Sequence, residues 1–272
     1  MDAAAAAAFV VHPFASRLPT PRDPRRAALM SSIEVSEEDG VRYLHFGTHW
    51  IQGAMRIARP WSLELEYTRD MMFPLLWHTG ALWPRNALVI GLGAASLTRF
   101  LYRYRPHASQ TVLEIDPAVV NVAQQCFKLP DEKPRLRIEI GDGADYVLAS
   151  DRQFDWILVD GFDADGHAGA LDTLPFYCNC LARLAERGVM SVNLLTYRHG
   201  LRGSLQRLRA AFGDRVLALP ACDSGNVIAI ASAGAPVSAS ARALTAAAAR
   251  LRARTRLDLA PTLRRMAAAG AA

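Results

Sequence analysis

Residues 87–96 read ALVIGLGAAS, a short apolar strand followed at once by a Gly-x-Gly turn and the start of a helix. Glycines allow the backbone to approach a ligand closely, and the first turn of a helix offers N–H groups that no carbonyl has taken. The turn therefore indicates a ligand-binding corner of an α/β sheet. Taken alone, Gly-x-Gly is a weak signal, and a plain tight connection between a strand and a helix is the alternative.

Downstream of this turn the chain alternates between strand-like and helix-like segments. Strands are expected at residues 87–90, 111–115, 137–140, 156–159 and 189–193, and helices at residues 96–104, 118–127, 143–149 and 173–185. Such alternation with buried strands predicts a parallel sheet covered by helices on both faces. After a helix at 200–212, strands at 215–219 and 226–231 flank a short turn, so the sheet is expected to end in an antiparallel hairpin.

Four regions are expected along the chain. Residues 1–30 are rich in Ala and then in Pro and Arg, without apolar periodicity, and are predicted to be disordered. Residues 31–66 contain short alternating runs that predict a small antiparallel β domain. Residues 67–234 form the nucleoside-binding α/β domain, which begins with apolar residues at helical spacing over 67–83. Residues 235–272 form an Ala- and Arg-rich helical tail, whose packing points are Leu244, Leu251, Leu257 and Leu263.

The composition is that of a folded protein from a reducing compartment. Of 272 residues, 51% are hydrophobic, which is enough for packed cores. The four cysteines are too few and too scattered for a disulfide framework. No apolar run reaches the roughly 18 residues of a membrane span, and a secretory signal is not recognisable. We therefore expect a soluble, cytoplasmic protein.

The net charge of +5 is unevenly distributed. Residues 91–170 hold 8 Lys and Arg against 12 Asp and Glu, whereas residues 198–272 hold 12 against 3. A basic tail can bind nucleic acid or an acidic membrane surface. No aromatic residue interleaves with the arginines between 250 and 256, which favours a solvated helix face. Neither nucleic acid nor a membrane is therefore expected as a partner.

Acidic residues follow the second and third strands of the expected sheet. Glu114 ends the second strand, where a carboxylate can bind the hydroxyl pair of a ribose. A surface acid is the alternative. Asp142 lies between Gly141 and Gly143 at the end of the third strand. There it can accept a hydrogen bond from an adenine amino group or cap the next helix, and both roles can coexist.

The fourth strand ends in the loop Asp160-Gly161-Phe162-Asp163-Ala164-Asp165-Gly166. Carboxylates so close together raise one another's proton affinity, so the loop can accept a proton or hold a cation. The spacing of its three acids fits no calcium loop, and no His or Cys stands at the spacing of transition-metal ligands. No metal is therefore expected. His167 follows in the same loop and could contact a substrate, but a hydrogen-bonded or exposed histidine without a ligand role is the favoured interpretation.

These motifs favour a sulfonium nucleoside over a nicotinamide dinucleotide. A dinucleotide-binding fold would have a third glycine where Ser96 stands, and a further parallel strand in place of the hairpin. The predicted fold class is therefore α/β: a Rossmann-like methyltransferase sheet, mostly parallel and ending in an antiparallel hairpin, with a small N-terminal antiparallel β domain.

From about residue 33 to residue 231 the sequence resembles the spermidine synthase (polyamine aminopropyltransferase) family, in particular its divergent bacterial spermidine synthase-like branch. The resemblance rests on Trp50-Ile51-Gln52-Gly53, the glycine loop, Leu113-Glu114-Ile115-Asp116, Gly141-Asp142-Gly143 and the Asp160 loop. In that family these features bind decarboxylated S-adenosylmethionine, and an amine or polyamine is the acceptor. The resemblance also suggests a homodimer.

The resemblance implies a role for each matching residue. Gln52 would lie near the amino-acid side of the nucleoside, Glu114 on the ribose and Asp142 on the adenine amine. Asp160 would be the base that acts on the attacking amine, aided by Asp163. The other implied contacts are Gly91, Gly93 and Gly143 for the donor, and Tyr67, Asp163 and Tyr177 for the acceptor.

Three departures from the family pattern affect the interpretation. The family's glycine loop carries an Asp that binds the aminopropyl ammonium, and Ala94 stands in its place. The family's Asp-Ser-Ser-Asp-Pro loop appears as Asp160-Gly161-Phe162-Asp163-Ala164. Its Tyr-x-Glu appears as Tyr67-Thr68-Arg69, with Asp70 as an approximate substitute. Without an acid at position 94, the carboxylate of ordinary S-adenosylmethionine is no longer repelled there. Two alternatives therefore stay open, a methyltransferase of unknown substrate and a non-catalytic nucleoside-binding module.

Overall fold

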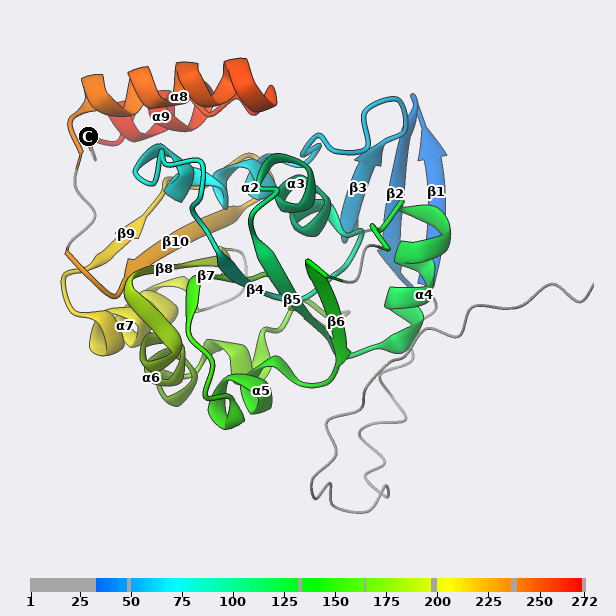
Figure 1. Ribbon diagram of the computed structural model, residues 1–272, viewed down its shortest axis with the longest axis horizontal. Coiled ribbons are helices and arrows are strands. Elements are labelled where there is room, and N and C mark those ends of the chain that lie inside the picture. Colours follow the sequence, from blue (N-terminus) through cyan, green and yellow to red (C-terminus); the bar gives the residue numbers. More distant parts are fainter. Residues whose placement is uncertain are drawn as a thin grey trace, which may run out of the picture.

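The computed structural model describes residues 33–47, 50–131, 134–163, 165–196, 200–235 and 239–270. The segment 1–30, predicted to be disordered, lies outside the described residues. The described chain forms a seven-stranded sheet with helices on both faces and a separate three-stranded sheet (Figure 1). The α/β fold class expected from the sequence is confirmed.

The large sheet has the strand order β6-β5-β4-β7-β8-β10-β9. Its strands are β4 (Asn86–Ile90), β5 (Ser109–Glu114), β6 (Leu136–Ile140), β7 (Phe154–Val159), β8 (Leu184–Leu195), β9 (Val216–Ala218) and β10 (Asn226–Ser232). The first five strands in this order are parallel, and β10 is antiparallel to both of its neighbours. The expectation of a mostly parallel sheet that ends in an antiparallel pair is therefore confirmed.

Alternate residues of each strand enter two different cores, because successive side chains of a strand point to opposite faces. In β4, Val89 packs into one core, whereas Leu88 and Ile90 pack into the other. Helices α3 (Ser96–Tyr104), α4 (Pro117–Cys126) and α8 (Ala241–Thr255) cover the first face. Helices α5 (Gly143–Ala149), α6 (Leu174–Arg183) and α7 (Leu201–Phe212) cover the second face.

The small sheet is an antiparallel meander of β1 (Ile33–Glu38), β2 (Val41–Phe46) and β3 (Gly53–Arg56). Asp39 and Gly40 turn between the first two strands with φ of 49° and 72°, the left-handed conformation of a tight hairpin turn. The apolar run at residues 55–57 predicts a third strand there, and the observed strand begins two residues earlier than this run. The reason is Gly53, whose bare backbone pairs with Leu44 while lying directly against the glycine loop.

The apolar spacing over 67–83 does not give one continuous helix. Helix α2 (Glu66–Asp70) is followed by the 3₁₀ turn η1 (Phe73–Leu76) and then by irregular chain. Pro74 has no N–H to donate and disfavours the helical conformation at the preceding residue, so the α-helix ends before it. Met71, Met72, Leu75 and Leu76 are nevertheless buried, as the spacing predicts, whereas Trp77 is half-buried.

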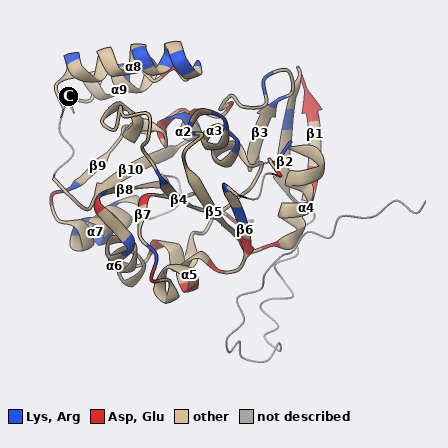
Figure 2. Ribbon diagram, viewed as in Figure 1, with Lys and Arg blue, Asp and Glu red and all other residues tan. Residues whose placement is uncertain are grey.

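The C-terminal residues form two helices, α8 and α9 (Ala260–Ala268), which lie side by side over the first face of the sheet (Figure 1). Leu244, Leu251 and Leu257 are buried and Leu263 is half-buried, so the four leucines expected to be packing points do pack. The arginines of α8 are exposed, and their positions along the helix are blue in Figure 2. Among the described residues, no helix combines the length and the apolar character needed to cross a bilayer.

Candidate active site

A cavity of about 790 Å³ lies at the carboxyl ends of the parallel strands. In open α/β sheets ligands bind at this edge. The small sheet, α2 and the chain between β9 and β10 complete the wall. Nine of the expected site residues line the cavity: Gln52, Tyr67, Gly91, Gly93, Glu114, Asp142, Gly143, Asp160 and Asp163. The topology therefore brings these nine residues, which lie far apart in sequence, to one place.

Gly91 is required by the close approach of two neighbouring strand ends. Its φ is +92°, and a Cβ at this position would lie 2.1 Å from the carbonyl oxygen of Asp160. The N–H of Asp160 donates to the carbonyl of Ile90 at 2.8 Å, so the two strand ends are fixed to each other. Gly91 therefore sets the position of the catalytic candidate Asp160 as well as the shape of the loop.

The glycine loop also packs tightly against the small sheet. A Cβ added to Gly53 would lie 2.5 Å from the methyl group of Ala94. Ala94 is buried and contributes to an apolar cluster with Leu44, Met55 and Phe127. The adjacent Gln52 faces the cavity, and its backbone N–H donates to Leu44 at 2.8 Å. The small residues at 53 and 94 thus allow the N-terminal sheet to bring Gln52 to the cavity.

Glu114 is buried and accepts two backbone hydrogen bonds. Its carboxylate takes the N–H of Leu92 at 2.9 Å and that of Asp116 at 3.0 Å. Burial raises the pKa of Glu114, and these backbone N–H groups act in the opposite direction. Each carboxylate oxygen can accept more than one hydrogen bond, so Glu114 can hold the glycine loop and still bind a hydroxyl group in the cavity.

Asp142 caps helix α5. Its side chain accepts the N–H of Ala144 at 2.7 Å and that of Asp145 at 3.4 Å. The capping alternative for Asp142 is therefore realised. Both bonds go to the same oxygen, and Asp142 also lines the cavity, so the second oxygen can bind a ligand.

Asp160 is held by two side-chain donors from different elements. The amide of Asn193 donates to Oδ1 at 2.9 Å, and the hydroxyl of Tyr67 donates to Oδ2 at 3.3 Å. Desolvation by the surrounding protein raises the pKa of Asp160, while the two donors act to lower it. Burial also raises the pKa of Tyr67 well above its usual value, so this hydroxyl stays a donor at physiological pH. The arrangement suits a carboxylate that accepts a proton during a reaction.

Asn193 and Asn226 are functional candidates that the sequence analysis did not find. Both are buried, and both line the cavity. Asn193 ends the predicted apolar strand at residues 189–193, and a polar residue at the carboxyl end of such a strand is the signal that could have identified it. Asn226 is the first residue of β10, and no local pattern distinguishes it from a turn residue.

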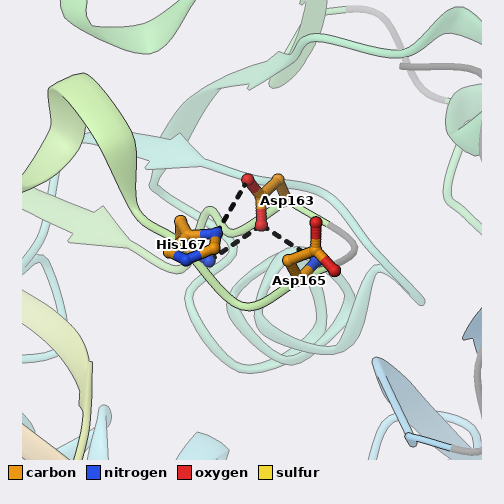
Figure 3. Close-up of side chains that lie close together, drawn as sticks. All are labelled: Asp163, Asp165 and His167. Carbon is orange, nitrogen blue, oxygen red and sulfur yellow. Dashed lines mark hydrogen bonds and ion pairs between the residues drawn. The ribbon is translucent and has the colours of Figure 1, made fainter. Parts of the chain in front are cut away.

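Asp163, Asp165 and His167 lie close together at the rim (Figure 3), with their possible ligand atoms within 4.8 Å of one another. The sequence spacing did not suggest that His167 joins the acids. One oxygen of Asp163 accepts the N–H groups of Asp165 and His167 at 2.9 and 2.8 Å. The imidazole of His167 lies 3.3 Å from its other oxygen. Asp163 therefore shapes its own loop as well as lining the cavity.

The expected substrate contact of Tyr177 needs correction. Tyr177 is fully buried in the core under α6 and is not among the residues that line the cavity. Its hydroxyl donates to Asp172 at 2.7 Å, at the end of the 3₁₀ turn η2 (Gly169–Asp172). The helix direction turns this ring toward the sheet, so Tyr177 supports the loop rather than the ligand.

Helix α2, which carries Tyr67, is anchored by the C-terminal helix α9. Arg265 pairs with both Glu66 and Asp70, the acid that the sequence offered as an approximate substitute in the Tyr-x-Glu motif. Thr262 donates to Asp70 at 2.5 Å. Burial raises the pKa of Asp70, with Arg265 and Thr262 acting against it. Asp70 is therefore a structural acid that faces α9, and it does not line the cavity.

The cavity wall is strongly acidic. Among the described residues that line it, six carry carboxylates, one is a histidine and none is Lys or Arg. The acids are Glu66, Glu114, Asp142, Asp160, Asp163 and Asp223. Charges at the wall of a partly closed cleft add to a potential that attracts ions of opposite sign. The site therefore suits a cationic ligand.

Comparison with known proteins agrees with this geometry. A family model for the spermine/spermidine synthase domain matches residues 64–196. A polyamine aminopropyltransferase from Chromobacterium violaceum is 38% identical over 223 residues, which cover 81% of this chain and 82% of that protein. A crystal structure described as a probable spermidine synthase from Corynebacterium glutamicum matches with a TM-score of 0.68 at 20% identity, covering 81% of this chain and 83% of that one. Human methyltransferase-like protein 13 in complex with SAH matches with a TM-score of 0.62 at 24% identity, covering 71% and 93%. At these identities the two structures show a shared fold alone.

Proposed function

The chain belongs to the spermine/spermidine synthase family and is a transferase of the polyamine aminopropyltransferase type, and we propose that it uses decarboxylated S-adenosylmethionine as the donor and a diamine or polyamine as the acceptor. The single observation that carries the choice of donor is the acidic cavity wall, on which no described residue is Lys or Arg. Both substrates of this reaction are cations.

The charge of the cavity distinguishes the two forms of the donor. The decarboxylated form carries a sulfonium and an ammonium, whereas ordinary S-adenosylmethionine also carries a carboxylate. Near a protein surface, two unit charges 4 Å apart interact by roughly 4 kcal/mol. Placing a carboxylate in this cavity without a described cationic partner is therefore unfavourable. The surrounding acids thus supply the selection that a single acid at position 94 supplies in the family pattern.

For the donor, we assign the residues at the strand ends. Gly91, Gly93 and Gly143 let the nucleoside approach the backbone, while Glu114 accepts from the ribose hydroxyls. Asp142 accepts from the adenine amine through the oxygen that does not cap α5. Gln52 reaches the aminopropyl end from the small sheet. These assignments follow the family resemblance and agree with the position of each residue on the cavity wall.

For the acceptor, we assign Asp160 as the base, with Tyr67 and Asp163 beside it. An aliphatic ammonium with a pKa of about 10.4 is protonated at neutral pH and cannot attack. Asp160 accepts one proton from it, and the amine lone pair then attacks the methylene carbon next to the sulfonium. A C–N bond forms, the C–S bond breaks, and its electron pair leaves with the sulfur as a neutral thioether. Asp163 attracts the cationic acceptor at the rim.

Calorimetry with the two forms of the donor tests this proposal. We expect the decarboxylated donor to bind at least about tenfold more tightly, which corresponds to about 1.4 kcal/mol. Product analysis by mass spectrometry, with a diamine as acceptor, should then show aminopropyl transfer. Asp160→Asn should lower the transfer rate by roughly 10²–10⁴ but keep donor binding, and Asp214→Asn, at an exposed acid after α7, should change neither. Tighter binding of ordinary S-adenosylmethionine would instead favour methyl transfer, and binding of neither would contradict the site assignment.

Four further features are proposed: a homodimer, a solvated surface on α8, a cytoplasmic location and the domain boundaries. The family resemblance suggests a homodimer, which native mass measurement tests. The exposed arginines of α8 lie opposite a packed face, which agrees with a solvated helix rather than a nucleic-acid surface. The four cysteines are free, in agreement with a cytoplasmic location. We also keep the division at residues 30, 66 and 234 as the proposed domain boundaries.

A further inference from the structure

A chain of side-chain hydrogen bonds leads from the turn before β10 to Asp160. The Ser224 hydroxyl donates to Oδ1 of Asn226 at 2.6 Å, and Nδ2 of Asn226 donates to Oδ1 of Asn193 at 2.9 Å. Nδ2 of Asn193 then donates to Oδ1 of Asp160 at 2.9 Å. The thiol of Cys222 lies 3.1 Å from the Ser224 hydroxyl at the outer end. The two asparagines are 4% and 8% exposed, so water does not readily replace these partners.

The direction of this chain matters because an amide has different groups at its two ends. Its oxygen only accepts hydrogen bonds, and its nitrogen only donates them. Since Asn226 donates to the oxygen of Asn193, the nitrogen of Asn193 is left facing Asp160. Rotation of the Asn193 amide by half a turn would place its oxygen against the Asp160 carboxylate. That arrangement is repulsive unless Asp160 is protonated, so the observed direction stabilises the ionised form that a base requires.

We infer that Asn226 is a positioning residue for the reaction, holding the amide of Asn193 in the orientation that keeps Asp160 ionised and ready to accept a proton. This inference rests on the proposed role of Asp160 as the base. Asn226 acts through Asn193 and not by contact with the reacting atoms. This positioning role also explains why a buried asparagine occupies the first position of β10, which is otherwise apolar up to Ser232.

Few other groups act on Asp160 directly. Tyr67 faces it from α2, and Cys222 acts electrostatically on Tyr67. Glu66, Asp163 and Asp223 share the cavity wall. Among the described residues the Asn226 side chain bonds to Asn193 and Ser224, and Cys222 is reached through Ser224. Tyr67 and these carboxylates keep their own contacts in a variant of Asn226, so a change in the titration of Asp160 reports on the Asn193 amide.

The decisive experiment replaces Asn226 and follows Asp160 in two independent ways. The first is the acidic limb of kcat/KM against pH. The second is the ¹³C signal of the Asp160 carboxyl group in protein labelled at aspartate, assigned with Asp160→Asn. Each method gives a midpoint, the pH at which the acidic limb or the ¹³C signal has changed by half. In Asn226→Leu both midpoints should rise by about one pH unit, a tenfold change in proton affinity, because Asn193 loses the partner that orients it. Asn226→Asp should raise them further, since an ionised carboxylate accepts from Asn193 and reverses its amide.

Ser191→Ala is the matched control. Ser191 lies two residues before Asn193 on β8, is fully buried, and accepts a hydrogen bond from Trp156 at 3.1 Å. Its loss should lower stability and leave both midpoints in place. If Asn226→Leu does not fold, Ser224→Ala, at an exposed position, should give a smaller shift in the same direction.

The outcomes separate this inference from the proposed function. Unchanged midpoints in an active Asn226→Leu protein would overturn the inference and leave aminopropyl transfer intact. Equal shifts in Ser191→Ala would also overturn it, because a general loss of packing would then be the cause. If the wild-type protein transfers no aminopropyl group, the proposed function fails, and the carboxyl titration still decides whether Asn226 controls Asp160.

Discussion

The pairing of Arg265 with helix α2 gives a prediction that links the C-terminal helix to the cavity. Arg265 contacts Glu66 and Asp70, and the Asp70 side chain is only 3% exposed. Replacing Arg265 by Met keeps much of the apolar length of the side chain and removes its charge. Asp70 is then left buried with Thr262 as its remaining side-chain partner. An uncompensated buried charge is the main cause of the loss that we expect.

The magnitude follows from the burial of the two partners. Removing one partner of a buried ion pair costs about 3–5 kcal/mol. The Arg265 side chain is 21% exposed and therefore partly solvated, so we expect a loss of about 2–4 kcal/mol in the free energy of unfolding at pH 7. For a protein of this size that corresponds to a fall of roughly 5–12 °C in the unfolding midpoint. Adding Asp70→Asn should recover most of the loss, because the neutral amide needs no counter-ion.

The loss should also depend on pH. Asp70 already has a raised pKa in the folded protein, and removal of Arg265 raises that pKa further. In the window between the unfolded and the folded pKa the folded state binds more protons, so its stability falls as pH rises. Arg265→Met should therefore recover stability as the pH is lowered from 7 toward 4, and the Asp70→Asn double variant should not show this dependence.

Chemical denaturation of the four proteins of this double-mutant cycle measures the effect. The coupling free energy between Arg265 and Asp70 should exceed about 1 kcal/mol at pH 7 and decline at acidic pH. The reasoning is refuted if Arg265→Met unfolds at the wild-type denaturant concentration. It is equally refuted if the loss is the same in the presence and absence of the Asp70 carboxylate.

Three further predictions concern the cavity. Asp160→Asn should lower kcat by roughly 10²–10⁴, the usual contribution of a positioned base, with donor affinity by calorimetry within about twofold of wild type; full activity would exclude this base. Gly91→Ala should abolish donor binding and lower the thermal unfolding midpoint, because the added methyl group would lie 2.1 Å from the Asp160 carbonyl oxygen. Calorimetry measures the binding and thermal unfolding measures the midpoint. Normal donor binding would contradict the close approach. Dialysis against EDTA should leave the transfer rate unchanged, because Asp163 already accepts two backbone N–H groups. A transfer rate that falls after dialysis and recovers on addition of a divalent cation would instead assign Asp163, Asp165 and His167 to metal binding.

Most of the sheet could be predicted from local patterns, because apolar residues repeat at a different spacing in strands and in helices. Helices at 96–104 and 143–149 lie where the spacing placed them. Strand β8 is longer than the segment 189–193 and extends back to Leu184, with a register shift against β7 between Phe154 and Trp156. The added residues include Glu186 and Gly188, which have poor strand propensity. Residues 185–188 fall within this register shift and have no paired residue on β7, and the carbonyl of Gly188 accepts the N–H of Ala233 at 2.9 Å.

The site was predictable where its residues follow parallel strands, and not where it depends on pairing between distant segments. Asp160 could be located from the strand before it, since the carboxyl ends of parallel strands share one edge. Asn226 lies opposite Leu195 in the antiparallel pair, a register that sequence spacing does not give. Tyr177 was misplaced for a similar reason, because the direction in which a helix turns its aromatic side chain depends on which face of the sheet the helix covers.

The packing of the small sheet against the glycine loop gives a physical reason for Ala94 at the position of the family's acid. Ala94 and Gly53 are in contact, and together they close the gap between the glycine loop and β3. An acid at position 94 would give the donor ammonium one near partner. In the function proposed above, that attraction is expected to come from the six carboxylates around the cavity, at longer distances. Because salt screens long-range interactions more than close contacts, donor affinity in this chain should depend on ionic strength more steeply than in relatives that keep the acid. The departure therefore changes how the charge is distributed, while the cavity remains suited to a dication.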